Sequence, residues 1–235
     1  MIGRVVLAAL LAGIAAGLIM GVVQHVRLTP LILEAEKYEH SGAHNHAADI
    51  GDDLGKVPPI SSQDEAAWAP KDGLERTFFT TAASVVTGAG FAAVLAGISI
   101  LGGAPITARN GVLWGLCGFL AFTLAPAAGL SPELPGMPAA DLMSRQLWWI
   151  STIAATAIGI WLIAFRRETW APIAAVVLIA LPHLIGAPPP PTHESGVPAG
   201  LAAEFAANVL AVGALFWCIT GTFLGFAMDR FAKEA

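Results

Sequence analysis

Six long apolar stretches without charge run along the chain, and the connectors between them hold almost all of its charged residues. The stretches cover residues 5–23, 78–101, 111–130, 147–165, 170–187 and 205–228, and each has at least 18 residues without Asp, Glu, Lys or Arg. A helix of about 20 apolar residues crosses a bilayer, because a hydrocarbon core of about 30 Å is covered at 1.5 Å per residue. The pattern predicts an all-α integral membrane bundle of about six transmembrane helices, in one domain over residues 1–235.

Two of the stretches leave an alternative open. Residues 170–187 form the shortest stretch and contain Pro182 and His183, so five membrane crossings are the alternative to six. Residues 5–23 follow Arg4 and could belong to a signal peptide. That run has 19 residues, against about 7–15 for the apolar region of a signal peptide, and no small-residue cleavage site follows it. We therefore expect an uncleaved first transmembrane helix.

Composition supports a membrane protein rather than a large soluble domain. Hydrophobic residues make up 56% of the chain and charged residues 12%, whereas a soluble domain has about 25% charged residues. Cys117 and Cys218 lie inside apolar stretches, which favours packing over redox chemistry or metal binding. Several glycines recur at four-residue steps, as expected where helices pack closely in lipid: Gly13, Gly17, Gly21, Gly221 and Gly225.

The basic residues predict the orientation of the bundle. With six crossings, both termini share a side with the second and fourth connectors, and basic residues close to the spans gather on that side: Arg4, Arg109, Arg166, Arg167, Arg230 and Lys233. Basic residues near the membrane favour the cytoplasm. Arg27 and Arg76 oppose this orientation. We expect a multi-pass protein of the bacterial inner (cytoplasmic) membrane with both termini in the cytoplasm.

The long first connector, residues 24–77, is then an external loop, and it is acidic. Between positions 26 and 77 there are ten Asp or Glu against five Lys or Arg, a difference equal to the formal net charge of −5. Such a loop raises the local concentration of cations. We expect a short helical piece at residues 30–36 and a flexible run over residues 40–50.

Histidines on the external side are candidate metal ligands. Three stand close together in the loop: His40, His44 and His46. Imidazole suits cobalt, nickel, copper and zinc, so the three could bind one divalent ion; the alternative is a solvated loop. A second group lies near or just beyond the ends of the first and fifth stretches: His25, His183, His193 and Glu194. These could converge on a metal path near carbonyls released by Pro182, or each could be an interfacial side chain.

The absence of several sequence motifs excludes some classes of enzyme. The chain has no GxxxxGK(S/T), HExxH or GxSxG motif, so we expect no phosphate-loop ATP hydrolysis, zincin or α/β-hydrolase chemistry and no enzyme activity. No nucleic-acid partner is expected. Asp141 and Arg145 are four residues apart, which predicts a local ion pair.

Five segments carry a recognisable pattern: PLILEAEKYE at 30–39, GLCGF at 115–119, PELPGMP at 132–138, RQLWW at 145–149 and LPHLIGAP at 181–188. Together they resemble the CbtA family of cobalt transporter subunits. The resemblance covers almost the whole chain. It implies a permease subunit that takes up Co²⁺ as cargo, with Ni²⁺ second, holds no permanent cofactor, and works with a CbtB-like small single-span subunit that contains histidines.

The resemblance also gives weight to particular residues. The first segment contains Glu34 and Glu36 and the last contains His183, so these are expected at the metal path together with His193. A non-transporting accessory or metal-binding subunit is the alternative function.

Overall fold

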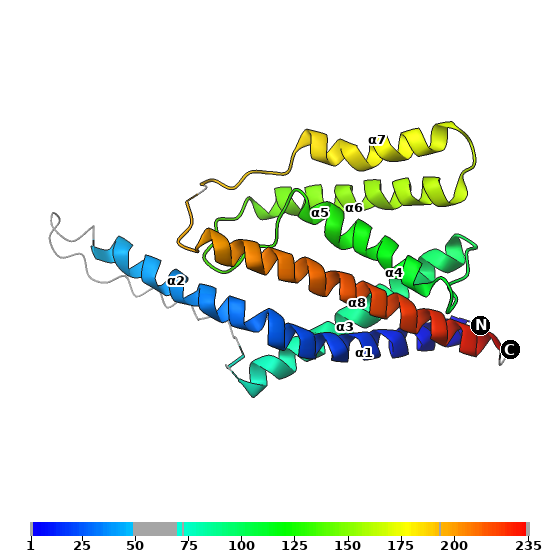
Figure 1. Cartoon of the computed structure of the whole chain (residues 1–235), viewed down its shortest axis with the longest axis horizontal. Coiled ribbons are helices and arrows are strands. Elements are labelled where there is room, and N and C mark those ends of the chain that lie inside the picture. Colours follow the sequence, from blue (N-terminus) through cyan, green and yellow to red (C-terminus); the bar gives the residue numbers. More distant parts are fainter. Residues whose placement is uncertain (1, 49–69, 72, 193, 234–235) are drawn as a thin grey trace.

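The chain is a bundle of long helices, described here from a computed structural model. The structure describes residues 2–48, 70–71, 73–192 and 194–233, with the backbone alone at 39–48 and 232–233, and these ranges contain no strand. In chain order the elements are α1 (Ile2–Arg27), α2 (Thr29–Ala48), α3 (Leu74–Leu101), α4 (Gly111–Phe119), η1 (Leu120–Leu124), α5 (Ala125–Ala127), α6 (Leu142–Phe165), α7 (Trp170–Ile185) and α8 (Ala199–Lys233) (Figure 1).

The predicted all-α membrane bundle is confirmed. Helices α1, α3, α6 and α8 are long and apolar enough to span a membrane. The other two apolar stretches are shorter: α4, η1 and α5 form one continuous helix over residues 111–127, and α7 has 16 residues. Both chain ends lie at the same end of the bundle, where Arg4 Nη1 donates to the carbonyl of Phe231 at 3.4 Å (Figure 1). The chain returns to this end because it runs along the bundle an even number of times, and α7 is the fifth of these passes.

Glycines bring pairs of helices into backbone contact, as their spacing predicts. A Cβ at Gly13 of α1 would lie 2.2 Å from Ala89 Cα of α3, and one at Gly17 would lie 2.4 Å from Val85 Cα. Between α4 and α8, a Cβ at Gly221 would lie 2.1 Å from the Gly111 carbonyl. A side chain at these positions would push the helices apart, so the missing Cβ permits the close packing that replaces hydrophobic attraction in lipid.

Aromatic side chains fill the centre between α3, α8 and the 111–127 helix. The ring centroids of Phe91 and Trp217 are 4.7 Å apart, and those of Phe122 and Trp217 are 5.5 Å apart. Trp217 is 2% exposed, and its indole Nε1 donates to the Thr123 hydroxyl at 3.0 Å. Thr123 belongs to the π-helical turn η1, so the wider turn places a polar acceptor where the buried indole needs one.

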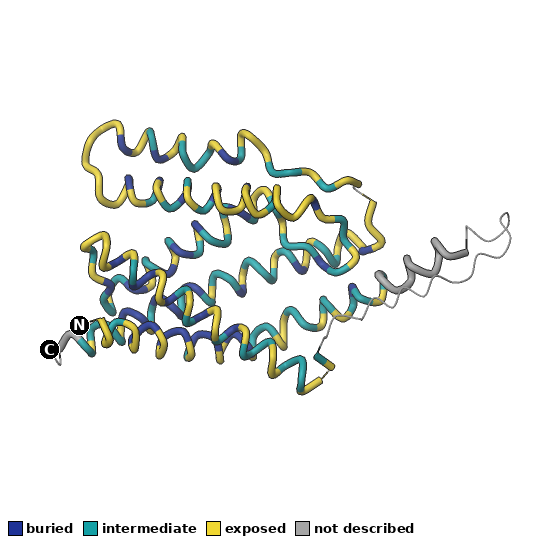
Figure 2. The backbone as a smooth tube through the Cα atoms, turned by 180° about the vertical axis from the view of Figure 1, so that it is seen from behind, coloured by how far each residue is buried: buried dark blue, intermediate teal, exposed yellow. Residues whose placement is uncertain are grey.

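Helices α6 and α7 form a pair at the edge of the bundle. Gly159 of α6 faces Ile179 and the Ala175 carbonyl of α7. Among the described elements, α7 packs against α6 and makes no comparable contact with another helix. Figure 2 shows the outward side of this pair as largely exposed, which is the face that lipid would cover.

Helix α2 corrects the prediction for the external loop. A short helix was expected at residues 30–36, but the observed helix has 20 residues and extends to Ala48. The prediction of a flexible run over residues 40–50 is therefore wrong for residues 40–48. The first half of α2 is held by packing: Ala35 is fully buried in a cluster with Leu134, Val197 and Phe205. Leu134 belongs to the connector before α6, Val197 to the segment that leads into α8, and Phe205 to α8 itself, so α2 joins separate parts of the chain at one end of the bundle.

The predicted pair between Asp141 and Arg145 is also wrong. Asp141 caps α6, where its carboxylate accepts from the backbone N–H and the hydroxyl of Ser144, both at 2.9 Å. These hydrogen bonds lower the pKa of Asp141. Arg145 instead pairs with Glu133 at 3.0 Å. Capping engages the aspartate in bonds to the first turn of the helix, and the arginine reaches a carboxylate that is distant in sequence.

Candidate functional site

The described candidate residues all lie at the end of the bundle opposite the chain termini. His25 is in the last turn of α1, Glu34 and Glu36 are in α2, His183 is in the last turn of α7, and Glu194 is in the connector that follows (Figure 1). His193 lies outside the described residues, as do the side chains of His40, His44 and His46. The helix directions therefore bring the predicted ligands to one end of the molecule.

His25 is held at a small cavity between α1, α2 and α3. Its Nδ1 lies 3.3 Å from the Thr77 hydroxyl, and that hydroxyl also donates to the Gly73 carbonyl at 3.0 Å. A hydroxyl has one proton, so the Thr77 oxygen accepts from Nδ1–H of His25. The lone pair of neutral His25 is then on Nε2, the nitrogen that can bind a metal ion. The cavity has a volume of about 50 Å³ and is also lined by Thr29 and Arg76.

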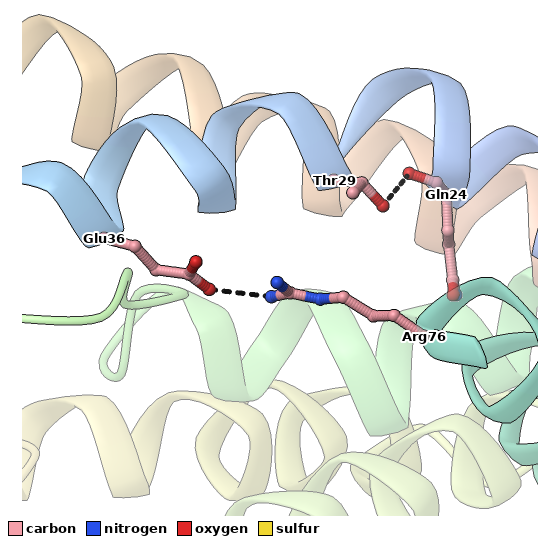
Figure 3. A network of polar contacts seen from close by, with 4 residues as sticks. All are labelled: Gln24, Thr29, Glu36 and Arg76. Atoms are coloured by element: carbon pink, nitrogen blue, oxygen red, sulfur yellow. Dashed lines mark hydrogen bonds and ion pairs between the residues drawn. The ribbon is translucent and has the colours of Figure 1, made fainter. Parts of the chain in front are cut away.

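A guanidinium joins α2 to α3 beside this cavity (Figure 3). Arg76 Nη2 donates to Glu36 Oε1 at 2.7 Å, and both side chains are less than one-third exposed. In the same view, the Thr29 hydroxyl donates to the Gln24 carbonyl at 3.4 Å, across the junction of α1 and α2. The Gln24 side-chain oxygen accepts from Ser84 of α3 at 3.1 Å. The corner is thus fixed by polar contacts between three helices, and Glu36 is engaged by a positive charge.

Glu34 is engaged by a basic residue of its own helix. Its carboxylate accepts from Lys37 Nζ at 2.5 Å, and the two side chains are 44% and 70% exposed. The hydrogen bond and the charge of Glu34 raise the pKa of Lys37. Exposed pairs of this kind are weak and exchange readily with ions from solution.

His183 is positioned by Trp148 of α6. The two ring centroids are 5.8 Å apart, with planes at 74°. Trp148 Nε1 donates to the Pro182 carbonyl at 3.2 Å, and Gly186 N donates to the same carbonyl at 3.0 Å. The connector closes over the indole at Gly129, where a Cβ would lie 2.3 Å from the ring. The last turn of α7 is therefore fixed to α6, and His183 stands partly buried at its edge.

The candidates do not form one preassembled metal centre in the described part of the chain. There, no three His, Cys, Asp or Glu side chains lie close enough together to bind one ion. His25 contacts Thr77 of α3, whereas His183 contacts Trp148 of α6. The sequence did not predict the residues that contact the candidate ligands: Thr77 beside His25, Arg76 beside Glu36, and Trp148 beside His183. Trp148 had a signal as a tryptophan near a span end; the other two had none.

Comparison with known proteins identifies the family. The family described as "Probable cobalt transporter subunit (CbtA)" matches residues 2–229, nearly the whole chain. No curated protein and no solved structure matches the chain. The chain belongs to the CbtA family, and the resemblance seen in the five sequence segments is confirmed.

Proposed function

We propose that this protein is the membrane permease subunit of an uptake system for divalent transition metal ions, with Co²⁺ as first cargo and Ni²⁺ as second. The observation that carries the proposal is the family match over residues 2–229. The apolar helices agree with an integral membrane protein. The protein lies in the inner membrane with its termini in the cytoplasm, so the end that bears His25, Glu36 and His183 faces outward.

The outer end handles the ion before it enters the bundle. The acidic first connector concentrates cations near the membrane surface. Glu34 and Glu36 are occupied by Lys37 and Arg76, and an arriving ion displaces these side chains in exchange for its own charge. His25 Nε2 lies beside this exchange and supplies a nitrogen ligand of the kind that cobalt and nickel bind.

His183 is the residue at which the ion leaves the outer end. Trp148 fixes the turn of α7 that bears it, so the imidazole is held at a set position rather than on a loose helix end. Pro182 within α7 lacks an N–H and leaves a carbonyl of the preceding turn without its usual donor. Freed carbonyls and an imidazole are ligands for a partly dehydrated ion. His193 and Glu194 follow the extended proline segment and extend the same ligand set.

A second candidate is an accessory subunit that binds metal or stabilises a complex without conducting it. It is favoured by the separation of His25 from His183 and by the lack of a three-ligand group among the described side chains. A CbtB-like single-span subunit with histidines would then complete the path. Both candidates place the chain in a complex, in agreement with a family of transporter subunits.

Uptake of radioactive cobalt by cells that lack their own cobalt transporters separates the two candidates. A permease subunit gives saturable uptake with the partner subunit, and that uptake falls at least tenfold in His183→Ala and His183→Gln, which both lose the ring nitrogen. Glu168→Gln, at the other end of the bundle, is the control and keeps wild-type uptake. If the partner alone transports as well as the pair, the chain is accessory. If His183→Ala transports like wild type at every cobalt concentration, the role given to His183 is wrong.

A further inference from the structure

A groove at the same end of the bundle is lined by none of the described candidate metal ligands. It has a volume of about 400 Å³ and runs between the end of the 111–127 helix, the start of α6 and one residue of α8. Most of its lining is apolar: Phe122, Pro126, Ala127, Leu130, Pro132, Leu142, Trp149 and Leu210. Phe122 and Leu210 lie well inside their helices, so the groove extends from the connector into the apolar part of the bundle.

Charged and polar groups in the lining come mainly from the connector and the first turns of α6. They are Ser131, Glu133, Arg145 and Gln146, and Thr123 of η1 is a further polar residue in the lining. Glu133 and Arg145 pair at 3.0 Å with side chains 25% and 32% exposed, so Glu133 is more enclosed than the paired Glu34 or Glu168, which are 44% and 49% exposed. The groove thus has one positive and one negative group at the level of the helix start and an apolar surface beyond them.

We propose that this groove binds one phospholipid with a zwitterionic head that carries a primary ammonium, phosphatidylethanolamine. The phosphate contacts Arg145 and the ammonium contacts Glu133, so the lipid's two charges complement the pair that now satisfies itself. Arginine recognises phosphate oxygens through its planar set of donors, and a primary ammonium donates hydrogen bonds to a carboxylate. An acyl chain lies along Phe122, Leu142 and Leu210, where neither water nor a hydrated ion would be favoured.

The charge pair decides which head group is preferred. Glu133 cancels the charge of Arg145, so a head with a net negative charge gains little from the site and approaches a carboxylate as well. Phosphatidylglycerol has the phosphate without an ammonium and should bind less well. Phosphatidylcholine has no N–H to donate to Glu133 and should also bind less well. The proposal is independent of metal transport, because it needs neither an ion nor a partner subunit.

Native mass spectrometry of the full-length protein in detergent, with equimolar phosphatidylethanolamine and phosphatidylglycerol, tests it. We expect one retained phosphatidylethanolamine. Glu133→Gln should shift the ratio about tenfold towards phosphatidylglycerol, the effect of one charge-assisted hydrogen bond. Arg145→Gln should lose retention of both lipids. Glu168→Gln removes the partner of Arg166 at the other end of the bundle and should leave the ratio unchanged.

A second measurement follows the same site without a charge change. Trp149 lines the groove and is 40% exposed, so brominated acyl chains of bound lipid should quench its fluorescence. The contribution of Trp149 is the fluorescence of the wild-type protein minus that of Trp149→Phe. Quenching should be stronger with brominated phosphatidylethanolamine than with brominated phosphatidylglycerol in mixed vesicles. A wild-type protein that retains no lipid and shows equal quenching overturns the proposal, as does a lipid ratio that Glu133→Gln leaves unchanged. In the first case the groove is empty or takes a protein segment, and in the second Glu133 does not select the bound lipid.

Discussion

Replacing Gly88 of α3 by Ala tests whether backbone contact between α1 and α3 holds the bundle together. A Cβ at Gly88 would lie 2.5 Å from the Gly13 carbonyl oxygen, whereas ordinary van der Waals contact begins at 3.4 Å. The obstacle is backbone, so it cannot rotate away. The two helices must separate locally by about 0.9 Å.

The cost of that separation can be estimated from the loss of contact. A gap of 0.5–1 Å forfeits about a quarter to a half of the attraction between the atoms that face it, and overpacking in a tight core costs about 1–3 kcal/mol. The matched control is Gly90→Ala, two residues along the same helix, where an added Cβ meets nothing within 4 Å. There the change should be neutral or stabilise the helix by up to about 1 kcal/mol.

Thermal unfolding of the purified protein in detergent, followed by size-exclusion chromatography, measures the difference. At about 2–4 °C per kcal/mol for a chain of this size, a difference of about 1–4 kcal/mol means that Gly88→Ala should unfold about 2–16 °C below Gly90→Ala. Equal midpoints for the two variants would show that α1 and α3 are not held by this contact, and a fall confined to Gly90→Ala would contradict the packing itself.

Three further predictions concern topology, the loop and the cap of α6. In a background without the native cysteines, a cysteine at Ser195 should react with an impermeant thiol reagent in whole cells and one at Thr169 should not; the reverse pattern would invert the proposed orientation. Replacing His40, His44 and His46 of the first connector together by Ala should raise the external cobalt concentration needed for half-maximal uptake several-fold and spare the saturated rate, because these residues concentrate the ion before it permeates. Asp141 has a lowered pKa, so it stabilises the fold above the ordinary aspartate value of 3.8 and this contribution is lost as pH falls through the lower folded value. The melting point of Asp141→Ala should therefore lie below wild type at pH 7 and approach it in acid, and a deficit independent of pH would refute the role of the charge.

The helices could be predicted from the sequence because their signals are local. Stretches such as 78–101 and 147–165 are long, apolar and uncharged, and the structure places helices over both. The steps between Gly13, Gly17 and Gly21 likewise give one face of one helix without knowledge of its partner. The apolar pattern did not predict the end of α2, because this helix continues into polar sequence: it extends to Ala48 although its last residues carry no apolar pattern.

Contacts between distant residues could not be predicted from spacing. The i, i+4 rule suggested Asp141 for Arg145, but the helix cap engages Asp141 and leaves Arg145 to Glu133, twelve positions upstream. The same limit applies to His183: its position at the end of a span was visible, whereas Trp148 lies 35 residues earlier and meets it only because α6 and α7 pack side by side. The number of membrane crossings predicted that the candidate ligands lie at one end of the bundle. The residues that contact these ligands depend on helix packing, which the sequence does not show.

With six membrane crossings, as the apolar stretches predict, the shortness of α7 makes membrane thickness a variable for this protein. Sixteen residues rise about 24 Å, less than the hydrocarbon thickness that α1 and α3 can cross with residues to spare. Such hydrophobic mismatch is relieved by thinning the bilayer around the helix, at a cost that grows with each ångström. Because α7 is bound chiefly to α6, the deformation falls on the pair that positions His183. Lipids with shorter chains should therefore favour the arrangement of α6 and α7 seen here, and thicker bilayers should strain it.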